Sequence, residues 1–77
     1  MKKYKCPFKQ YQLVQFKLPE IYRPIDYQSF PFAQNEIVVF LGEIVQMPGH
    51  CIVACKNGKV YWGYHTDNFV EPDKDRI

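Results

Sequence analysis

Four side chains that could bind a metal ion or form a nucleophilic pair lie within sixteen residues, namely His50, Cys51, Cys55 and His65. Structural zinc sites bring their ligands in closely spaced pairs on turns, where two side chains can converge on one ion. Cys51 and Cys55 instead fall in an apolar run typical of a strand, which would hold their Cα atoms about 13 Å apart. His50 would point to the opposite face from Cys51. We therefore predict no metal site and expect ordinary core cysteines.

A cysteine nucleophile paired with His65, with Asp67 close by, is the other chemistry that these residue types could perform. Such a pair needs a thiolate in a partly exposed, electropositive cleft, whereas Cys51 and Cys55 lie in the most apolar run of the chain. The sequence has no Ser-His-Asp spacing, no phosphate-binding glycine loop and no catalytic pair of carboxylates. Three cysteines are also an odd number, which argues against a disulfide framework. We predict that the protein is not an enzyme and uses no cofactor.

The chain has the size and composition of one small folded domain. Its 77 residues are 47% apolar and 17% aromatic, enough for a single core. The formal net charge of +2 is too small for a strong nucleic-acid field over the whole surface. We expect a basic N-terminal segment over residues 1–10, the folded domain over 11–72 and a tail over 73–77. No stretch has the apolar length of an export signal or a bilayer span, so the expected location is cytoplasmic, without membrane contact.

The spacing of apolar residues predicts strands and no long helix. Val14 and Phe16 share one face of the first strand, and Leu18 would continue that face. The third strand is apolar on both faces, as expected for a strand that is covered on both sides. In the fourth strand, Trp62 and Tyr64 are expected on the same face. The five strands are expected near residues 11–17, 36–46, 51–55, 60–64 and 69–71.

The connections between the strands have distinct signals. The long segment from Pro19 to Asn35 contains three prolines, so little regular structure is expected within it. Gly42 predicts a bulge or bend in the second strand. Asn57-Gly58 favours a type I′ hairpin turn. Residues 65–68 have the polar composition of a short 3₁₀ turn before the last strand.

The second half of the chain resembles SH3 domains. Asp67-Asn68-Phe69-Val70-Glu71 is similar to the Ser-Asn-Tyr-Val-Glu segment that ends many of them. Asn35-Glu36 leading into Ile37 to Phe40, followed by Gly42-Glu43-Ile44-Val45, is similar to their "elsf-kkGd-ii-v" stretch. Together with the order of the strands, this resemblance over about residues 35–71 implies an all-β fold. The expected architecture is a small five-stranded SH3-like barrel with a long first loop and a short 3₁₀ turn before the last strand.

The residues of the SH3 peptide groove are replaced in this chain. The first strand reads Leu13-Val14-Gln15-Phe16 in place of an Ala-Leu-Tyr-Asp-Tyr-like segment, and His50-Cys51 stands near the position of the paired tryptophans. The long loop has only Glu20 and Asp26 as acids. These departures argue against a groove for proline-rich peptides, because one fold can carry different binding surfaces.

The aromatic residues provide the most promising binding site. A barrel this small cannot enclose every ring, so we expect Phe30 and Phe32 in the core and Tyr22, Tyr27 and Tyr61 exposed. We predict a non-catalytic binding module that docks on a larger protein through the long loop, residues 19–34, and the turn at 65–69. An accessory subunit and a host- or phage-encoded inhibitor both fit, and either a monomer or a homodimer is compatible. The predicted partner contacts are Tyr22, Tyr27, Trp62, Asp67 and Phe69.

The alternative function is nucleic-acid binding, as in Tudor-like or ribosomal-type SH3-like domains. Tyrosines near basic residues could stack on bases while the cations contact phosphates. The small net charge makes this the weaker hypothesis. Its candidate cations are Lys2, Lys3, Lys5, Lys9, Lys17 and Arg23.

Overall fold

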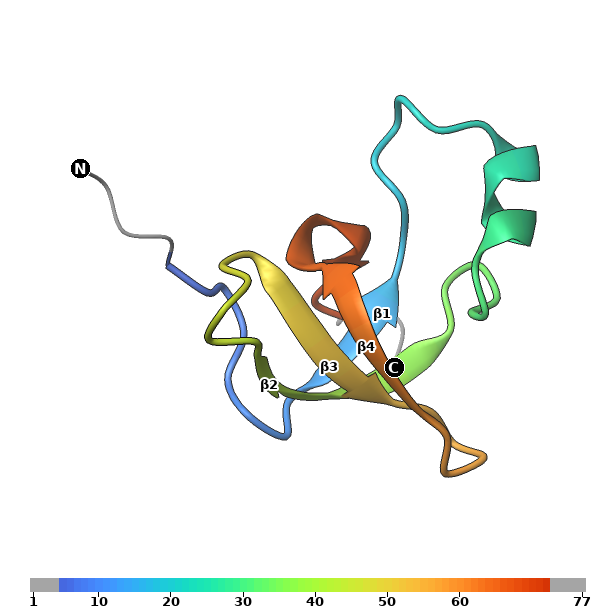
Figure 1. Ribbon diagram of the computed structural model, residues 1–77. Coiled ribbons are helices and arrows are strands. Elements are labelled where there is room, and N and C mark those ends of the chain that lie inside the picture. The colour runs from blue at the N-terminus through green and yellow to red at the C-terminus, as the bar shows by residue number, and fades with distance from the viewer. Residues whose placement is uncertain (1–4, 73–77) are drawn as a thin grey trace.

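A computed structural model describes residues 5–72, which form one five-stranded antiparallel sheet with two short 3₁₀ helices (Figure 1). The fold is all-β, with the order of strands that the sequence predicted. The elements are β1 (Leu13–Phe16), η1 (Pro24–Ser29), β2 (Ile37–Glu43), β3 (His50–Ala54), β4 (Val60–His65), η2 (Thr66–Asn68) and β5 (Phe69–Val70).

The strands are arranged in the order β4-β3-β2-β1-β5. In this part of the chain β4 and β5 are the two edges and do not pair with each other, so the sheet is not closed and the expected barrel is not confirmed. None of the described helices is long and apolar enough to cross a membrane.

One face of the sheet forms the core, as the two-residue period of the strands requires. Val14, Phe16 and Leu18 are buried on that face, as predicted. The other buried apolar residues are Phe32, Val38, Phe40, Cys51, Val53 and Phe69. We call this the inner face and the opposite one the outer face.

Two glycines introduce an extra residue into the ladder. The predicted bulge near Gly42 is present, because the pairing of β2 with β3 shifts between Phe40 and Gly42. A second shift lies at Gly63, with a φ of +87°: Cys51 pairs with Tyr64 but Ile52 pairs with Trp62. Since one extra residue reverses the face of everything beyond it, the prediction that Trp62 and Tyr64 share a face is wrong. Tyr64 joins Tyr61 on the inner side and Trp62 lies on the outer face.

The hairpin between β3 and β4 is present, but its turn type differs from the prediction. Gly58 has a φ of +86° and Asn57 does not have a positive φ. The Gly58 amide donates to the Cys55 carbonyl (3.0 Å), and the Lys59 amide donates to the Asn57 side chain (3.0 Å). This is the three-residue form of the hairpin, in which only the last loop residue is left-handed, in place of type I′.

The long connection covers the inner face and contains a helix that the prolines did not lead us to expect. Pro24 occupies the first position of η1, where its missing N–H costs nothing. Downstream of η1, Phe32 is buried and Phe30 is half-buried, so both expected core positions are confirmed. The Phe16 ring lies 5.2 Å from that of Phe30 and 4.9 Å from that of Phe32, between ring centroids. The loop therefore supplies the second layer of the core.

Candidate functional site

The tip of the long loop presents three apolar side chains to solvent. Ile21 is 86% exposed, Ile25 59% and Tyr22 45%. Large apolar side chains grouped at such exposure are typical of binding surfaces. The predicted exposure of Tyr22 is confirmed. We call Ile21, Tyr22 and Ile25 the loop tip.

Hydrogen bonds within the loop hold the backbone of the tip in one shape. The Tyr22 amide donates to the Pro19 carbonyl (2.9 Å), which closes a turn. The Arg23 amide donates to Asp26 Oδ2 (2.6 Å), and the Asp26 amide donates to the Arg23 carbonyl (2.9 Å). An acidic side chain that caps the first turn satisfies an amide that the helix leaves unpaired. The tip is consequently ordered by its own sequence.

Tyr27 anchors the loop and does not form part of an exposed surface. Its hydroxyl accepts a hydrogen bond from the Leu18 amide (3.0 Å), and its ring meets the Phe16 ring edge-on at 5.6 Å. The expectation that Tyr27 is exposed is therefore wrong. Tyr61 is also half-buried, against Phe32 at 5.2 Å, contrary to the same expectation. Both tyrosines use their apolar rings in the core and keep a polar end near the surface.

The turn before β5 lies beside the base of the loop. The Lys17 amide donates to the Asn68 carbonyl (2.9 Å), and Asp67 has a side chain that is 76% exposed. Phe69 is only 3% exposed and packs on Phe16 at 5.6 Å, so it cannot be the partner contact that we predicted. The two-residue strand β5 pairs Phe69 with Phe16 on the inner face, which buries the ring.

The imidazole of His65 caps η2. Its Nδ1 accepts a hydrogen bond from the Asp67 amide (3.1 Å), while Asp67 Oδ2 lies 3.4 Å from the same nitrogen. One nitrogen cannot accept from the amide and also carry a proton for the carboxylate. The two contacts therefore exclude each other at any one moment, and the amide bond is the one that caps η2. His65 thus has a structural role in shaping the turn.

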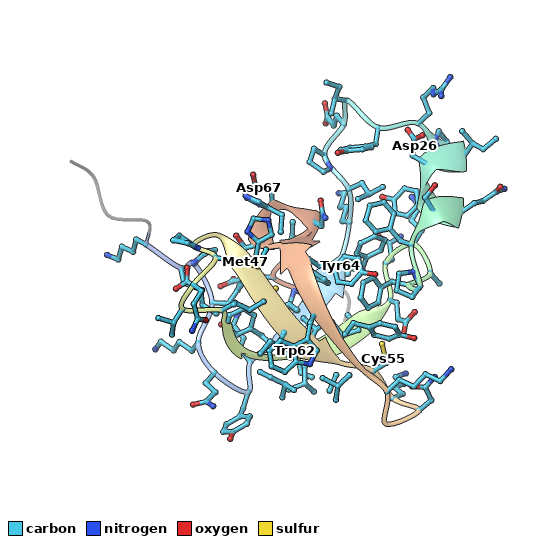
Figure 2. The ribbon with its side chains drawn as sticks, viewed as in Figure 1. Asp26, Met47, Cys55, Trp62, Tyr64 and Asp67 are labelled. Carbon is cyan, nitrogen blue, oxygen red and sulfur yellow. The ribbon has the colours of Figure 1, made fainter. Side chains whose placement is uncertain are left out.

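The five predicted contacts do not form a single surface. Tyr22 and Asp67 are exposed, Tyr27 and Phe69 hold the loop and the last strand, and Trp62, 67% exposed, lies on the outer face. Figure 2 shows that Tyr64 lies nearer to η1 than Trp62, although both side chains come from β4. Sequence reasoning missed Ile21 and Ile25. Their signal was two isolated isoleucines on either side of Tyr22-Arg23-Pro24 in a polar loop.

The cysteines lie where nucleophilic chemistry is disfavoured. Cys51 is fully buried, and its thiol donates to the Tyr64 carbonyl (3.3 Å). Burial, followed by the nearby Cys6 and Glu43, raises the pKa of Cys51 from its ordinary value of 9.0 to about 12. Burial and Glu36 also raise the pKa of Cys55. All three cysteines are free thiols.

The two histidines meet without completing a metal site. The rings of His50 and His65 lie 5.1 Å apart where β3 pairs with β4. Within residues 5–72 no group of three His, Cys, Asp or Glu side chains is placed to hold a metal ion.

The basic residues of the alternative hypothesis are spread over the surface. Lys2 and Lys3 lie outside the described residues, and Lys5, Lys9 and Lys17 are exposed. Arg23 is also exposed, 3.9 Å from an Asp26 carboxylate oxygen. A shallow cleft of about 660 Å³ is lined by Lys9, Gln10, Tyr11, Gln12, Leu13, Glu71 and Pro72. The cleft combines an exposed tyrosine with one lysine, but a carboxylate also lines it.

Comparisons of the chain with protein-family models, with curated proteins and with solved structures found no match.

Proposed function

We propose that this protein is a non-catalytic binding module of the SH3-like kind, which docks on a larger protein through the tip of its long loop. The observation that carries this proposal is the exposure of Ile21, Tyr22 and Ile25 on a backbone that is already hydrogen-bonded. Burying Ile21 against a partner would contribute up to about 1.5–3 kcal/mol, and the less exposed Ile25 and Tyr22 would contribute less. A loop ordered before binding loses little conformational entropy on docking, which favours affinity.

The turn at η2 contributes the second part of the proposed surface. Asp67 is exposed beside the loop base, where Asn68 is bonded to Lys17. A carboxylate at the rim of an apolar contact selects between partners more than it adds affinity. The partner is accordingly expected to offer an apolar pocket with a basic or hydrogen-bond-donating rim. Both an accessory subunit and an inhibitor would use such a surface.

The test removes the apolar tip without touching the core. Ile21→Ser together with Ile25→Ser should weaken partner binding by on the order of 100-fold, because two anchors are lost. The matched control is Val45→Ser, since Val45 is 87% exposed in the turn between β2 and β3. Affinity capture from the source cell should retain the same partner on the wild type and on the control, and lose it on the double variant. Equal retention by all three proteins would exclude the loop tip.

Nucleic-acid binding is tested with the wild type and with one lysine variant. Phosphate contacts make affinity fall steeply as salt rises. If the alternative function holds, a labelled single-stranded oligonucleotide should bind at low salt and dissociate at physiological salt, and Lys9→Gln should weaken it. Binding of the protein partner by the loop tip should persist at both salt concentrations.

A further inference from the structure

The outer face of the sheet carries apolar residues that residues 5–72 leave partly or largely exposed. Cross-strand register places Val60 of β4, Ala54 of β3, Val39 of β2 and Leu13 of β1 in one continuous row. Antiparallel sheets that face water usually carry polar residues on that side. The sequence predicted that β3 is covered on both faces, whereas Ile52 and Ala54 remain partly exposed. This face therefore has the composition of a covered surface.

The shape of this face is complementary to itself. A second row runs from Trp62 on β4 through Ile52 on β3 to Gly42 on β2. Side-chain size decreases along this row, from the indole of Trp62 to the single hydrogen of Gly42. A Cβ atom added at Gly42 would meet nothing within 4 Å. The row thus has a projecting ring at one end and open space at the other. Two copies of this row can pack face to face when they run in opposite directions, because the ring of one copy then lies over the glycine of the other.

We propose that a second copy of this chain covers the outer face, with a two-fold axis that runs along β3. This axis exchanges β4 with β2 between the copies. Trp62 of each copy then lies over Gly42 of the other, and Val60 over Val39. Ala54 lies on the axis and faces Ala54 of the second copy. Identical patches that meet in this way form an isologous interface, the usual arrangement in homodimers.

The area available is sufficient for a weak specific dimer. Trp62 is 67% exposed and Val60 47%, and the smaller apolar residues between them add partial exposures. Taking roughly 150–250 Å² for an aromatic side chain, the face offers on the order of 500 Å² per copy. The total of at most about 1,000 Å² only reaches the lower limit for a biological interface, so the dimer is expected to be weak and to form at high protein concentration.

The surroundings of the face support this occupant. The long loop packs on the inner face through Phe30 and Phe32, so the outer face is free for a second sheet at the usual distance of about 10 Å. The same axis brings both β3–β4 hairpins to one end, with Lys56 and Lys59 of each copy near those of the other. Because salt screens this repulsion, the dimer should become tighter as ionic strength rises.

Opposite charges introduced at Ala54 test both whether a second copy covers the face and whether the axis lies along β3. Sedimentation equilibrium from about 10 to 500 µM should show dimer formation by the wild type. Ala54→Lys and Ala54→Glu should each be monomeric, because like charges meet across the axis, and an equimolar mixture of the two should dimerise again. Trp62→Ser should weaken the dimer at least about 10-fold.

The control variant is Leu13→Lys, which places a charge on the outer face of β1, outside the exchanged strands. Circular dichroism and melting temperature should confirm that all variants are folded. A monomeric wild type at about 500 µM, a mixture of Ala54 variants that stays monomeric, or a Leu13→Lys variant as impaired as Ala54→Lys would each overturn the proposal. The double loop-tip variant at Ile21 and Ile25 should dimerise like the wild type, which separates this inference from the proposed function.

Discussion

Phe16 is the residue on which the attachment of the loop to the sheet depends most. Its ring is fully buried, with ring centroids of Tyr27, Phe30, Phe32 and Phe69 between 4.9 and 5.6 Å away. Aromatic pairs contribute about 0.5–1.5 kcal/mol each beyond the area that they bury. Phe16→Leu keeps most of the buried apolar area and removes four such contacts. Four such contacts would sum to about 2–6 kcal/mol, but contacts that share one ring are not additive, so we expect the free energy of unfolding to fall by about 2–3 kcal/mol.

The matched control is Phe40→Leu. Phe40 is equally buried on β2 but has one aromatic neighbour, Phe8, at 5.6 Å, so its loss should be about 0.5–1.5 kcal/mol. A domain of this size has a total stability of about 4–12 kcal/mol, so both variants should fold. The Phe16 variant should melt about 10–20 °C below the wild type.

Urea denaturation of the two variants measures this difference directly, with equal m-values as the sign that the denatured states are comparable. Hydrogen exchange adds a local measurement, because Phe16→Leu should release the amides of Leu18 and Phe30, which bond to Tyr27. Losses of stability that agree within about 0.5 kcal/mol between the two variants would refute the reasoning, as would loop amides that exchange no faster in the Phe16 variant than in the control.

Three further predictions concern single residues. The pKa of Cys51 is raised to about 12 by burial, so above pH 9 only the unfolded state loses this proton. Wild-type stability should then fall by about 1.4 kcal/mol per pH unit more steeply than that of Cys51→Ala, and parallel pH profiles would contradict this. Gly63→Ala should cost about 1–2 kcal/mol through its positive φ alone, since no atom lies within 4 Å of the added Cβ, and urea denaturation that shows no loss would contradict this. Asp26→Ala should cost about 0.5–2 kcal/mol and expose the Arg23 amide to hydrogen exchange, while Glu20→Ala should change stability by less than about 0.5 kcal/mol.

Local signals in the sequence identified most strands correctly, and the wrong assignment of faces in β4 has one physical cause. Gly42 was recognised as a bulge because it interrupts a long apolar run. Gly63 was not, because it falls in an alternating pattern that reads as a regular strand. One extra residue there reverses Tyr64 and Trp62 between the faces. A period of two determines which residues share a face only while the ladder is unbroken.

The candidate site shows the same limit. The exposure of Tyr22 followed from its place in a proline-bounded loop, which is local information. The burial of Phe69 depends on its pairing with Phe16, and that of Tyr27 on a hydrogen bond to Leu18. Both contacts join β1 to segments elsewhere in the chain, so no local pattern distinguishes these rings from exposed ones.

The arrangement of the loop accounts for both exposed apolar surfaces. In place of a second sheet, the loop supplies three rings, Tyr27, Phe30 and Phe32, that cover the inner face. This packing fixes the two ends of the loop, so the residues between them are held outward as an ordered tip. It also uses the loop on one side of the sheet only, and among residues 5–72 no further layer covers the apolar outer face. Since the tip and the outer face lie on opposite sides of the sheet, a dimer would carry two loop tips that remain free to dock. Two linked sites raise the effective affinity for a partner that presents repeated copies of its pocket.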